Sequence, residues 1–434
     1  MRITGGCAGR RCLRLPGFRL AVQNSVISPR TYSFEENGNY ILVGLRRAGK
    51  STLLYQRVRD LVAGGVDWTQ IIYINFEDER LSEFSMNDFQ DIVEVQSELS
   101  EKPGYYFFDE IQNVDGWEKF VRRLRDSGAR VFVTGSNAKM LSSEMERTLG
   151  GRLLSRHVYP YSFTEYLDAL GIPHKETDLL RTKSYGAIRR AFLSYYQDGG
   201  LPESLLYTNK RTYVESVYQK TLLGDIIARN GIRNEQAMRI LMKKIAETVR
   251  NSVSFTNLYG AVKAVGFKVS KDSIIEYVSY ASDAFLLFSL NNAAARFAEA
   301  QGSPKYYFAD NGILNLFLVD KTSALLENQV AICLHRLFGD SLHFLKSSQS
   351  DIDLDFYIPD AGLAVQAAIS LTDAEARARE VRTLTKLAAK DPDIQRFVIV
   401  TLEEEETIDC DGISIEVLPA AKFLLEMEQK ERLI

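Results

Sequence analysis

The chain has few of the residues that build disulfide frameworks and histidine-based metal sites. Its 434 residues include only four cysteines and four histidines. The cysteines are scattered and form no C-x-x-C pair, which argues against a zinc site and favours a reducing, cytoplasmic compartment. No segment reaches the roughly 18 consecutive apolar residues of a membrane span, and no secretory core follows the N-terminal charges. We therefore expect a protein with no membrane partner.

A large excess of charge of one sign is also missing. The formal net charge is −4, with 25% charged and 45% hydrophobic residues, as in ordinary globular proteins. Any contact with nucleic acid must therefore come from a local patch. A chain of this length exceeds one hydrophobic core and predicts two or three domains.

The first 34 residues differ from the rest in composition. They hold six arginines and no acid before Glu35. We expect residues 1–34 to be a disordered arm or the product of an upstream start codon. A basic arm that touches nucleic acid is the alternative.

One stretch, from Val43 to Thr52, fits the phosphate-binding pattern G-x-x-x-x-G-K-[ST] without a mismatch. An apolar run at 40–43 predicts a strand before it, and apolar spacing over 51–61 predicts a helix after it, which is the context that the pattern requires. Backbone N–H groups of such a loop cradle phosphates, a lysine reaches the terminal ones, and a hydroxyl binds Mg²⁺. The predicted residues for ATP are Gly44, Arg47, Ala48, Gly49, Lys50, Ser51 and Thr52.

A second strand, over 105–108, ends in two acids. Ligands bind at the carboxyl ends of strands in an open α/β sheet, so Asp109 is the expected Mg²⁺ anchor, together with Ser51. Glu110 is the expected catalytic group that polarises the attacking water, and Lys50 the expected catalytic cation. An apolar run before Asp-Glu is by itself common, and the phosphate loop is what favours the catalytic interpretation.

Two further predicted strands, over 71–76 and 130–134, also end in polar residues. Asn137, or its neighbour Ser136, would sense the terminal phosphate, and we select Asn137 as the catalytic residue. Glu77 and Asp78 either support the metal and the water or simply solvate the end of their strand.

These segments and several later ones resemble the prokaryotic AAA-type (AAA+) P-loop ATPases that carry a C-terminal domain of unknown function. The resemblance covers about residues 35 to 430 and rests on the following motifs: Gly44–Thr52, 75–78, 109–112, 134–137, 149–152, 159–163, 199–203, 307–312 and 327–328. It implies an α/β protein with a P-loop core on a parallel sheet (35–168), a helical and winged-helix-like middle (169–320), and an α+β domain like the restriction nucleases (321–434). It also implies a homo-oligomer in which an arginine of one copy completes the site of the next, with Arg152 as the best match and Arg147 or Arg156 as alternatives.

The middle region contains a candidate helix-turn-helix. Helical spacing over 256–265 is followed by a turn at 266–269, and Ser270 is an expected N-cap for a second helix. Strands at 285–290 and 305–308 would pair as a wing. Basic side chains here are few, chiefly Lys263, Lys268 and Lys271, so a protein contact or a structural role is favoured over DNA binding.

The last hundred residues alternate as α-β-β-β-α-β, which is similar to the restriction-nuclease core. Asp355 fits its first acid, Glu327 its helix acid, and Gln366 stands where a second acid belongs. Ala368 occupies the lysine position, and Lys386 is a weaker substitute. Loss of a carboxylate and a cation lowers metal affinity, so we expect a degenerate nuclease that contacts a partner.

Three functions are compatible with these motifs. The first, which we favour, is an ATPase whose hydrolysis drives or resets a conformational change passed to the C-terminal half. The second is a nucleic-acid-binding regulator that uses ATP as a structural ligand. The third is an ATP-gated nuclease. The absence of an Asn-Lys-x-Asp motif favours adenine over guanine.

Overall fold

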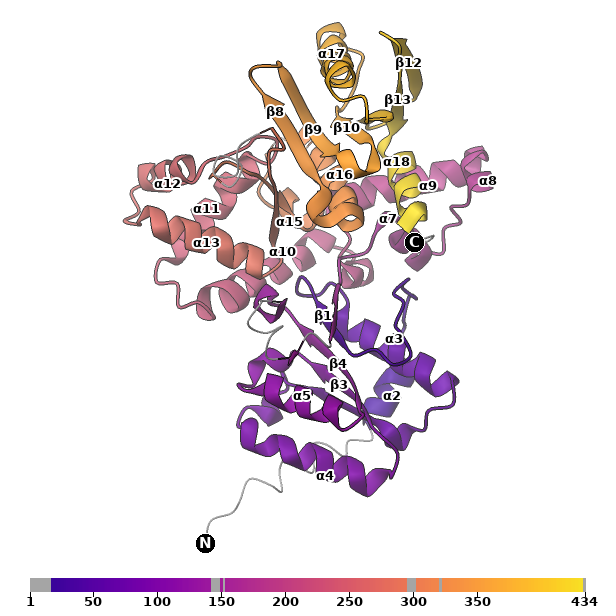
Figure 1. The fold of residues 1–434 in the computed structure, drawn as a ribbon, viewed down its shortest axis with the longest axis vertical. Helices are drawn as coiled ribbons and strands as arrows, with labels where there is room; N and C mark the ends of the chain where they lie inside the picture. The colour runs from indigo at the N-terminus through magenta and orange to yellow at the C-terminus, as the bar shows by residue number, and fades with distance from the viewer. Residues whose placement is uncertain (1–16, 142–148, 151–152, 295–301, 320–321, 432–434) are drawn as a thin grey trace. The chain divides into compact units, whose positions relative to one another are not determined.

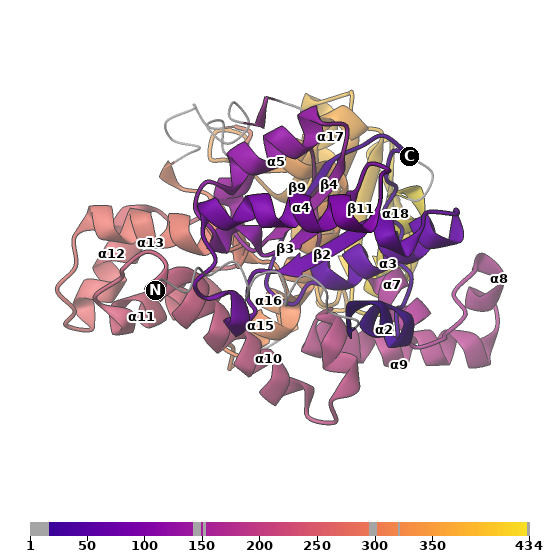
Figure 2. The same ribbon diagram turned by 90° about the horizontal axis from the view of Figure 1, so that it is seen from below.

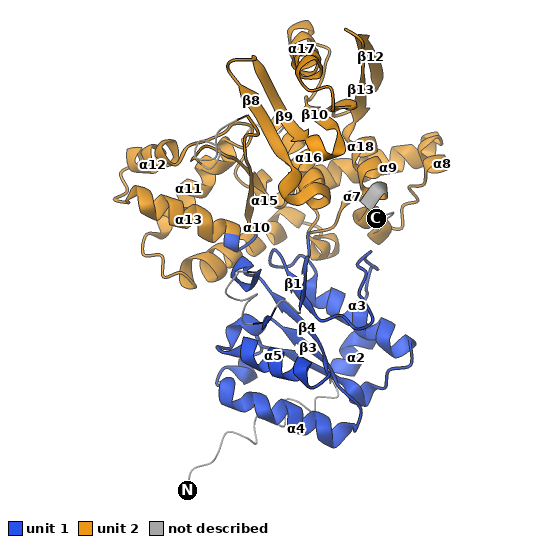
Figure 3. Cartoon of the chain, in the orientation of Figure 1, with its two compact units in different colours: residues 1–159, 283–285 blue, residues 160–282, 286–434 orange. Residues whose placement is uncertain are grey.

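The computed structural model describes residues 17–141, 149–150, 153–294, 302–319 and 322–431. The chain divides into two compact units (Figure 3): unit 1 comprises residues 1–159 and 283–285, and unit 2 comprises residues 160–282 and 286–434. Unit 2 thus spans both regions for which separate middle and C-terminal domains are predicted, and that finer division stays a prediction. Within the described ranges, no helix is both long and apolar enough to cross a bilayer.

Unit 1 is built on a five-stranded sheet in the order β2-β3-β4-β1-β5, in which every pairing is parallel. The strands are β1 Tyr40–Val43, β2 Ile71–Asn75, β3 Tyr105–Asp109, β4 Arg130–Gly135 and β5 Leu154–His157. The central strands β1, β3 and β4 are nearly continuous apolar runs because both faces of the sheet are covered. Edge strand β5 was not predicted, since its Leu-Ser-Arg-His sequence is short and exposed and lacks strand alternation.

Four helices cover the two faces of this sheet: α2 Gly17–Asn24, α3 Lys50–Ala63, α4 Phe89–Leu99 and α5 Trp117–Asp126. The rings of Phe89 and Phe120 stack with centroids 4.3 Å apart, which fixes α4 beside α5 on one face. Helices α2 and α3 lie on the other face, as Figures 1 and 2 show. The P-loop fold predicted for this part of the chain is therefore present.

The segment 1–34, which we expected to be a disordered arm, includes helix α2 and makes contacts with unit 1 within its described part, residues 17–34. Helix α2 buries Val22 completely, and Arg59 of α3 donates to the Val22 carbonyl at 3.0 Å. Arg30 is buried and donates to the carbonyls of Ala48 and Tyr159, each at 2.9 Å. This arginine satisfies backbone acceptors that are far apart in sequence, which composition alone does not reveal. Residues 1–16 lie outside the described ranges.

Unit 2 begins with helices and a hairpin. The helices are α7 Phe163–Ala169, α8 Glu176–Leu179, α9 Thr182–Asp198, α10 Lys210–Lys220 with a π-helical continuation Thr221–Ala228, α11 Glu235–Glu247, α12 Phe255–Ala264, α13 Lys271–Asp283 and α15 Asn311–Asn315. Strands β6 Leu287–Leu290 and β7 Lys305–Phe308 pair antiparallel, as expected for a wing. Ser270 caps α13 by accepting the Ser273 N–H at 3.0 Å, so the predicted helix-turn-helix boundaries are confirmed within one or two residues.

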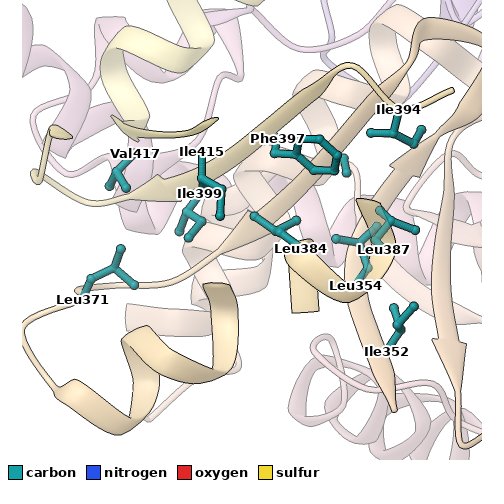
Figure 4. Close-up of a cluster of buried hydrophobic side chains, with 11 residues drawn as sticks. Ile352, Leu354, Leu371, Leu384, Leu387, Ile394, Phe397, Ile399, Ile415 and Val417 are labelled. Carbon is teal, nitrogen blue, oxygen red and sulfur yellow. The ribbon is translucent and has the colours of Figure 1, made fainter. Parts of the chain in front are cut away.

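The rest of unit 2 is a six-stranded mixed sheet in the order β12-β13-β11-β10-β9-β8. Its elements are α16 Thr322–Phe338, β8 His343–Ser347, β9 Ile352–Ile358, β10 Leu363–Ala367, α17 Ala374–Lys390, β11 Arg396–Thr401, β12 Glu406–Cys410, β13 Ile413–Pro419 and α18 Ala420–Glu431. Leu384 and Leu387 of α17 pack with Leu354 and Ile399 in one apolar cluster (Figure 4). Strands β12 and β13 were not predicted, because β12 is acidic and largely exposed at the sheet edge.

A buried polar network joins the helical part of unit 2 to α16. Asn328 accepts the Phe308 N–H at 2.8 Å and donates to the Phe308 carbonyl and to Asn311. Asp310 accepts the Gly200 N–H at 2.8 Å, and a side chain at position 199 would collide with its carboxylate. Three motifs that resembled the family's later motifs, around 199–203, 307–312 and 327–328, are thus parts of one structural network.

The hydrogen bonds of Arg30 generate a test of the N-terminal segment. Arg30→Ala leaves the buried carbonyls of Ala48 and Tyr159 without a charged donor, so we expect the free energy of unfolding of unit 1 to fall by about 2 to 3 kcal/mol. Both tryptophans, Trp68 and Trp117, lie in unit 1, and their fluorescence during urea unfolding reports this change selectively.

The control for this measurement is Arg80→Ala. Arg80 is exposed and pairs with the nearby Asp78 at the surface, so about 0.5 kcal/mol or less should be lost. Equal stability of the two variants would show that residues 17–34 are dispensable.

Candidate functional site

The loop that connects β1 to α3 has the backbone of a phosphate cradle. Gly44 and Gly49 have φ values of 153° and 100°, and a Cβ at position 44 would lie 2.1 Å from the Val158 carbonyl. Gly49 stands at the N-cap of α3, so the positive end of the helix opens into the loop. Arg47, also at positive φ, and the buried Ala48 complete the turn. The loop can therefore surround an anion with backbone N–H groups.

Lys50 is a buried cation held by the loop itself. Its ammonium donates to the carbonyls of Gly44 at 3.0 Å and Leu45 at 3.2 Å. It also lies 3.6 Å from a carboxylate oxygen of Glu110. Only about 5% of Lys50 is exposed, so its charge acts within the loop and is little screened by solvent.

Asp109, the last residue of β3, is a fully buried carboxylate surrounded by hydroxyl groups. It accepts hydrogen bonds from Thr134 at 2.5 Å and Tyr73 at 2.8 Å, and the Ser51 hydroxyl is a further partner. Burial, followed by the charge of Glu110, raises the pKa of Asp109, while these hydroxyls oppose the rise. Ser51 and Asp109, the two predicted metal ligands, are thus side by side.

Glu110 follows Asp109 in a left-handed conformation, with φ 52°, which turns its side chain toward Lys50. It accepts hydrogen bonds from Gln112 at 2.5 Å and Ser136 at 3.1 Å. Burial acts to raise its pKa, but Lys50 and these donors outweigh burial, and the pKa of Glu110 is lowered. An ionised carboxylate is therefore present beside the phosphate loop at neutral pH.

The remaining residues predicted for this site lie at its rim or outside the described ranges. Glu77 pairs with Arg46 at 2.8 Å, whereas Asp78 caps a turn by accepting the Arg80 N–H at 3.0 Å. Asn137 accepts the Lys139 N–H at 2.9 Å, and its neighbour Ser136 is the residue that contacts Glu110. Thr52, in the first turn of α3, is half-buried.

The arginine positions are only partly visible. Arg152 and Arg147 lie outside the described residues. Arg156, on the exposed strand β5, places its guanidinium 5.8 Å from the ring centroid of Tyr40.

Three contributors to this site were not predicted: Tyr73, Thr134 and Gln112. Tyr73 and Thr134 lie on the strands β2 and β4 that flank β3, and each donates to Asp109. Their positions near strand ends were a usable signal, but only knowledge of the strand order shows that both flank β3.

The nuclease-like residues of unit 2 meet a cation that sequence reasoning missed. Lys305 of β7 donates to Glu327 at 3.0 Å and to Asp355 at 2.9 Å, and the Tyr307 hydroxyl also donates to Glu327. Lys305 is 2% exposed; burial opposes its charge, but Asp355 and Glu327 outweigh burial and raise the pKa of Lys305.

The other residues of the predicted nuclease site play different parts. Gln366 accepts the Asp355 N–H at 2.7 Å and donates to Glu380 at 2.7 Å. Lys386 lies elsewhere, paired with exposed Asp351 at 2.5 Å. In the described part of the chain, no group of three or more acidic, histidine or cysteine residues is arranged to hold a metal.

Comparison with known proteins agrees with the geometry of unit 1. Residues 36–167 match a family model described as an AAA domain, and residues 189–324 match one described as a domain of unknown function (DUF8612). An uncharacterized protein of Methanocaldococcus jannaschii is 29% identical over 89% of this chain and 88% of its own length. An uncharacterized protein of Haemophilus influenzae is 28% identical over 89% of this chain and 94% of its own length.

Among solved structures, a Walker-type ATPase of Pyrococcus abyssi aligns with a TM-score of 0.40 at 15% identity, over 65% of this chain and 91% of its own. The assignment of unit 1 rests on the family match, the strand order and the clustered Lys50, Ser51, Asp109 and Glu110. The chain therefore carries a P-loop ATPase domain of the AAA type over residues 36–167.

Proposed function

We propose that the chain binds ATP with Mg²⁺ at the loop 44–52 and hydrolyses it, and that this cycle drives or resets a conformational change in unit 2. The observation that carries the proposal is the meeting of four side chains at the carboxyl end of the sheet. Lys50 lies 3.6 Å from Glu110, and Ser51 is hydrogen-bonded to Asp109. These are the cation, the base and the two metal ligands that hydrolysis of a nucleoside triphosphate needs.

The residues present fit both the nucleotide and the metal. Lys50 is buried and contacts two carbonyls and Glu110 among the described residues, so it can turn its charge toward phosphate oxygens. Ser51 and Asp109 supply a hydroxyl and a carboxylate, the hard oxygen ligands that Mg²⁺ prefers. Bound Mg²⁺ would neutralise phosphate charge and leave the other roles to the protein.

Glu110 is the group that acts on water in this proposal. Its lowered pKa keeps Glu110 ionised. Gln112 and Ser136 donate hydrogen bonds to the same carboxylate oxygen, Oε2, and so fix the direction of Oε1. An oriented carboxylate accepts a hydrogen bond from water and holds it for attack. Asn137 as the phosphate sensor and Arg152 as the arginine supplied by a neighbouring copy remain parts of the proposal.

A route for the conformational change runs through β5. This strand pairs with β1, which leads into the phosphate loop, and two residues after β5 the chain leaves unit 1. Arg30 binds both the loop, at the Ala48 carbonyl, and the exit, at the Tyr159 carbonyl. A shift of the loop would therefore pull on the segment that enters unit 2. We propose that unit 2 passes the change on to a protein partner.

The ion cluster in unit 2 argues against the alternative of an ATP-gated nuclease. The ammonium of Lys305 is bonded to both acids, Glu327 and Asp355, that a catalytic metal would need. We therefore assign this cluster a structural role, in which β7 is tied to α16 and β9.

The hydrolytic roles are tested by phosphate release from ATP and by nucleotide binding, measured on the same preparations. Lys50→Ala removes the buried cation, so nucleotide binding should be lost. Glu110→Gln keeps the size of the side chain and loses its charge, so binding should persist while turnover falls by roughly 10²-fold or more.

Glu98→Gln, an exposed change on α4, is the matched control and should keep full turnover. Unchanged turnover in Glu110→Gln would refute the water-activating role.

The structural role of Lys305 is tested by Lys305→Met. The buried Glu327 and the partly buried Asp355 then lose their ammonium, so unit 2 should be destabilised by about 3 to 5 kcal/mol. Hydrogen exchange of the slowest amides in β7, α16 and β9 measures this loss.

Lys346→Met breaks an exposed pair with Asp353 in the same unit and should cost about 1 kcal/mol or less. Similar exchange in both variants would mean that Lys305 does not hold the cluster together.

A further inference from the structure

An open groove of about 850 Å³ lies in the helical part of unit 2. It is formed by the loop before α11, the end of α12 with the following turn, and one face of α13. The loop at 230–234 precedes the predicted helix-turn-helix by more than twenty residues, so sequence reasoning did not combine the two. The groove belongs to unit 2, whereas the P-loop site belongs to unit 1.

Positive charge gathers on this groove without carboxylate partners. Arg233, Lys263 and Lys268 line it and are exposed. None of the three forms an ion pair with any residue that the structure describes, and Lys263 lies over the ring of Tyr259 at 5.5 Å. Because none of the three is paired with an acid in the described part of the chain, their charges are available to an external anion.

Three basic residues close by are paired instead. Arg239 of α11 lies 2.7 Å from Glu235, and Lys244 lies 3.6 Å from Glu247. Arg229, just before the groove, lies 3.4 Å from Asp225. The three cations of the groove therefore differ from these three neighbours, which are paired with carboxylates.

Two helix N-termini open on the same groove and add to its positive potential. Asn234 caps α11 by accepting the Ala237 N–H at 3.0 Å, and Ser270 caps α13. Both caps line the groove. Helix N-termini attract phosphate through their dipole and free N–H groups, so they reinforce the three side-chain cations.

The remaining lining narrows the chemistry of the ligand. Tyr280 of α13 is partly exposed and offers aromatic surface, whereas Tyr277 is buried. Glu276 is the one acid among the lining residues. A carboxylate repels phosphate but accepts hydrogen bonds from base amino groups, and aromatic rings stack on bases. An open groove with cations, rings and one acceptor suits a chain that carries both phosphates and bases.

We propose that this groove binds the phosphate backbone of a nucleic acid, with Arg233, Lys263 and Lys268 as the phosphate contacts. Binding of this kind is dominated by neutralised phosphates and carries little sequence information by itself. It requires neither hydrolysis nor nucleotide at the P-loop.

The test measures fluorescence anisotropy of labelled duplex and single-stranded DNA with the full chain, without ATP, across a range of salt concentrations. The double variant Arg233→Ala/Lys268→Ala removes two proposed phosphate contacts. Its Kd should rise by roughly tenfold or more, and the slope of log K against log salt should shrink by about 2.

The matched control is Arg239→Ala/Lys244→Ala, which removes the same charge from paired positions on α11. Its Kd should stay within about twofold of the wild-type value. Equal weakening in both double variants would reduce the effect to net charge and overturn the proposal, as would the absence of DNA binding by the wild type.

Two further arms complete the experiment. Inorganic polyphosphate that displaces DNA at equal phosphate concentration would show a general polyanion site and refute the nucleic-acid assignment. Lys50→Ala should bind DNA as the wild type does. Retained DNA binding with lost ATP turnover would separate this proposal from the one for unit 1.

Discussion

Two adjacent carboxylates buried at the end of β3 are the constraint around which unit 1 is organised. Asp109 and Glu110 repel each other, and burial would protonate both unless neighbours compensate. The structure compensates them differently. Asp109 accepts hydrogen bonds from hydroxyl groups, whereas Glu110 lies beside the ammonium of Lys50. The pKa of Asp109 is raised and that of Glu110 is lowered.

The motifs that are contiguous in sequence were predictable because their geometry is local. Strand, glycine loop and helix at 40–63 follow from apolar runs and from the turn that Gly44 and Gly49 permit, and β3 with its two acids follows from an aromatic run. The wing and the helix-turn-helix were equally local, since Ser270 is an N-cap recognisable by type.

What could not be predicted depends on contacts between distant segments. Arg30 appeared to belong to a tail because its partners, the carbonyls of Ala48 and Tyr159, are backbone atoms with no sequence signature. Tyr73 and Thr134 can donate hydrogen bonds to Asp109 only because β2 and β4 lie on either side of β3. The composition of β12 is that of a solvated loop, and the strand exists because β13 offers it an open edge.

The resemblance to a nuclease core stays a prediction, and the structure shows which contacts two of its residues make. Asp355 and Glu327 are where the pattern places them, yet the cation between them comes from β7, a strand of the wing. A lysine delivered from another element cannot be found by searching for spacing within the motif. Lys305 also explains why Glu327 and Asp355 are paired although Ala368 stands at the position of the usual lysine.

The surroundings of each basic side chain therefore decide its role better than its position in a motif does. Lys305 is itself buried and lies between Glu327 and Asp355, so its charge is used inside the fold. Lys50 faces one acid and two carbonyls, and a phosphate can compete for it because carbonyl contacts are weaker than an ion pair. Arg233 and Lys268 form no ion pair with a described residue and are exposed in a groove. The charge of Lys305 is thus neutralised within the fold. The charges of Lys50 and of Arg233 and Lys268 can interact with a ligand.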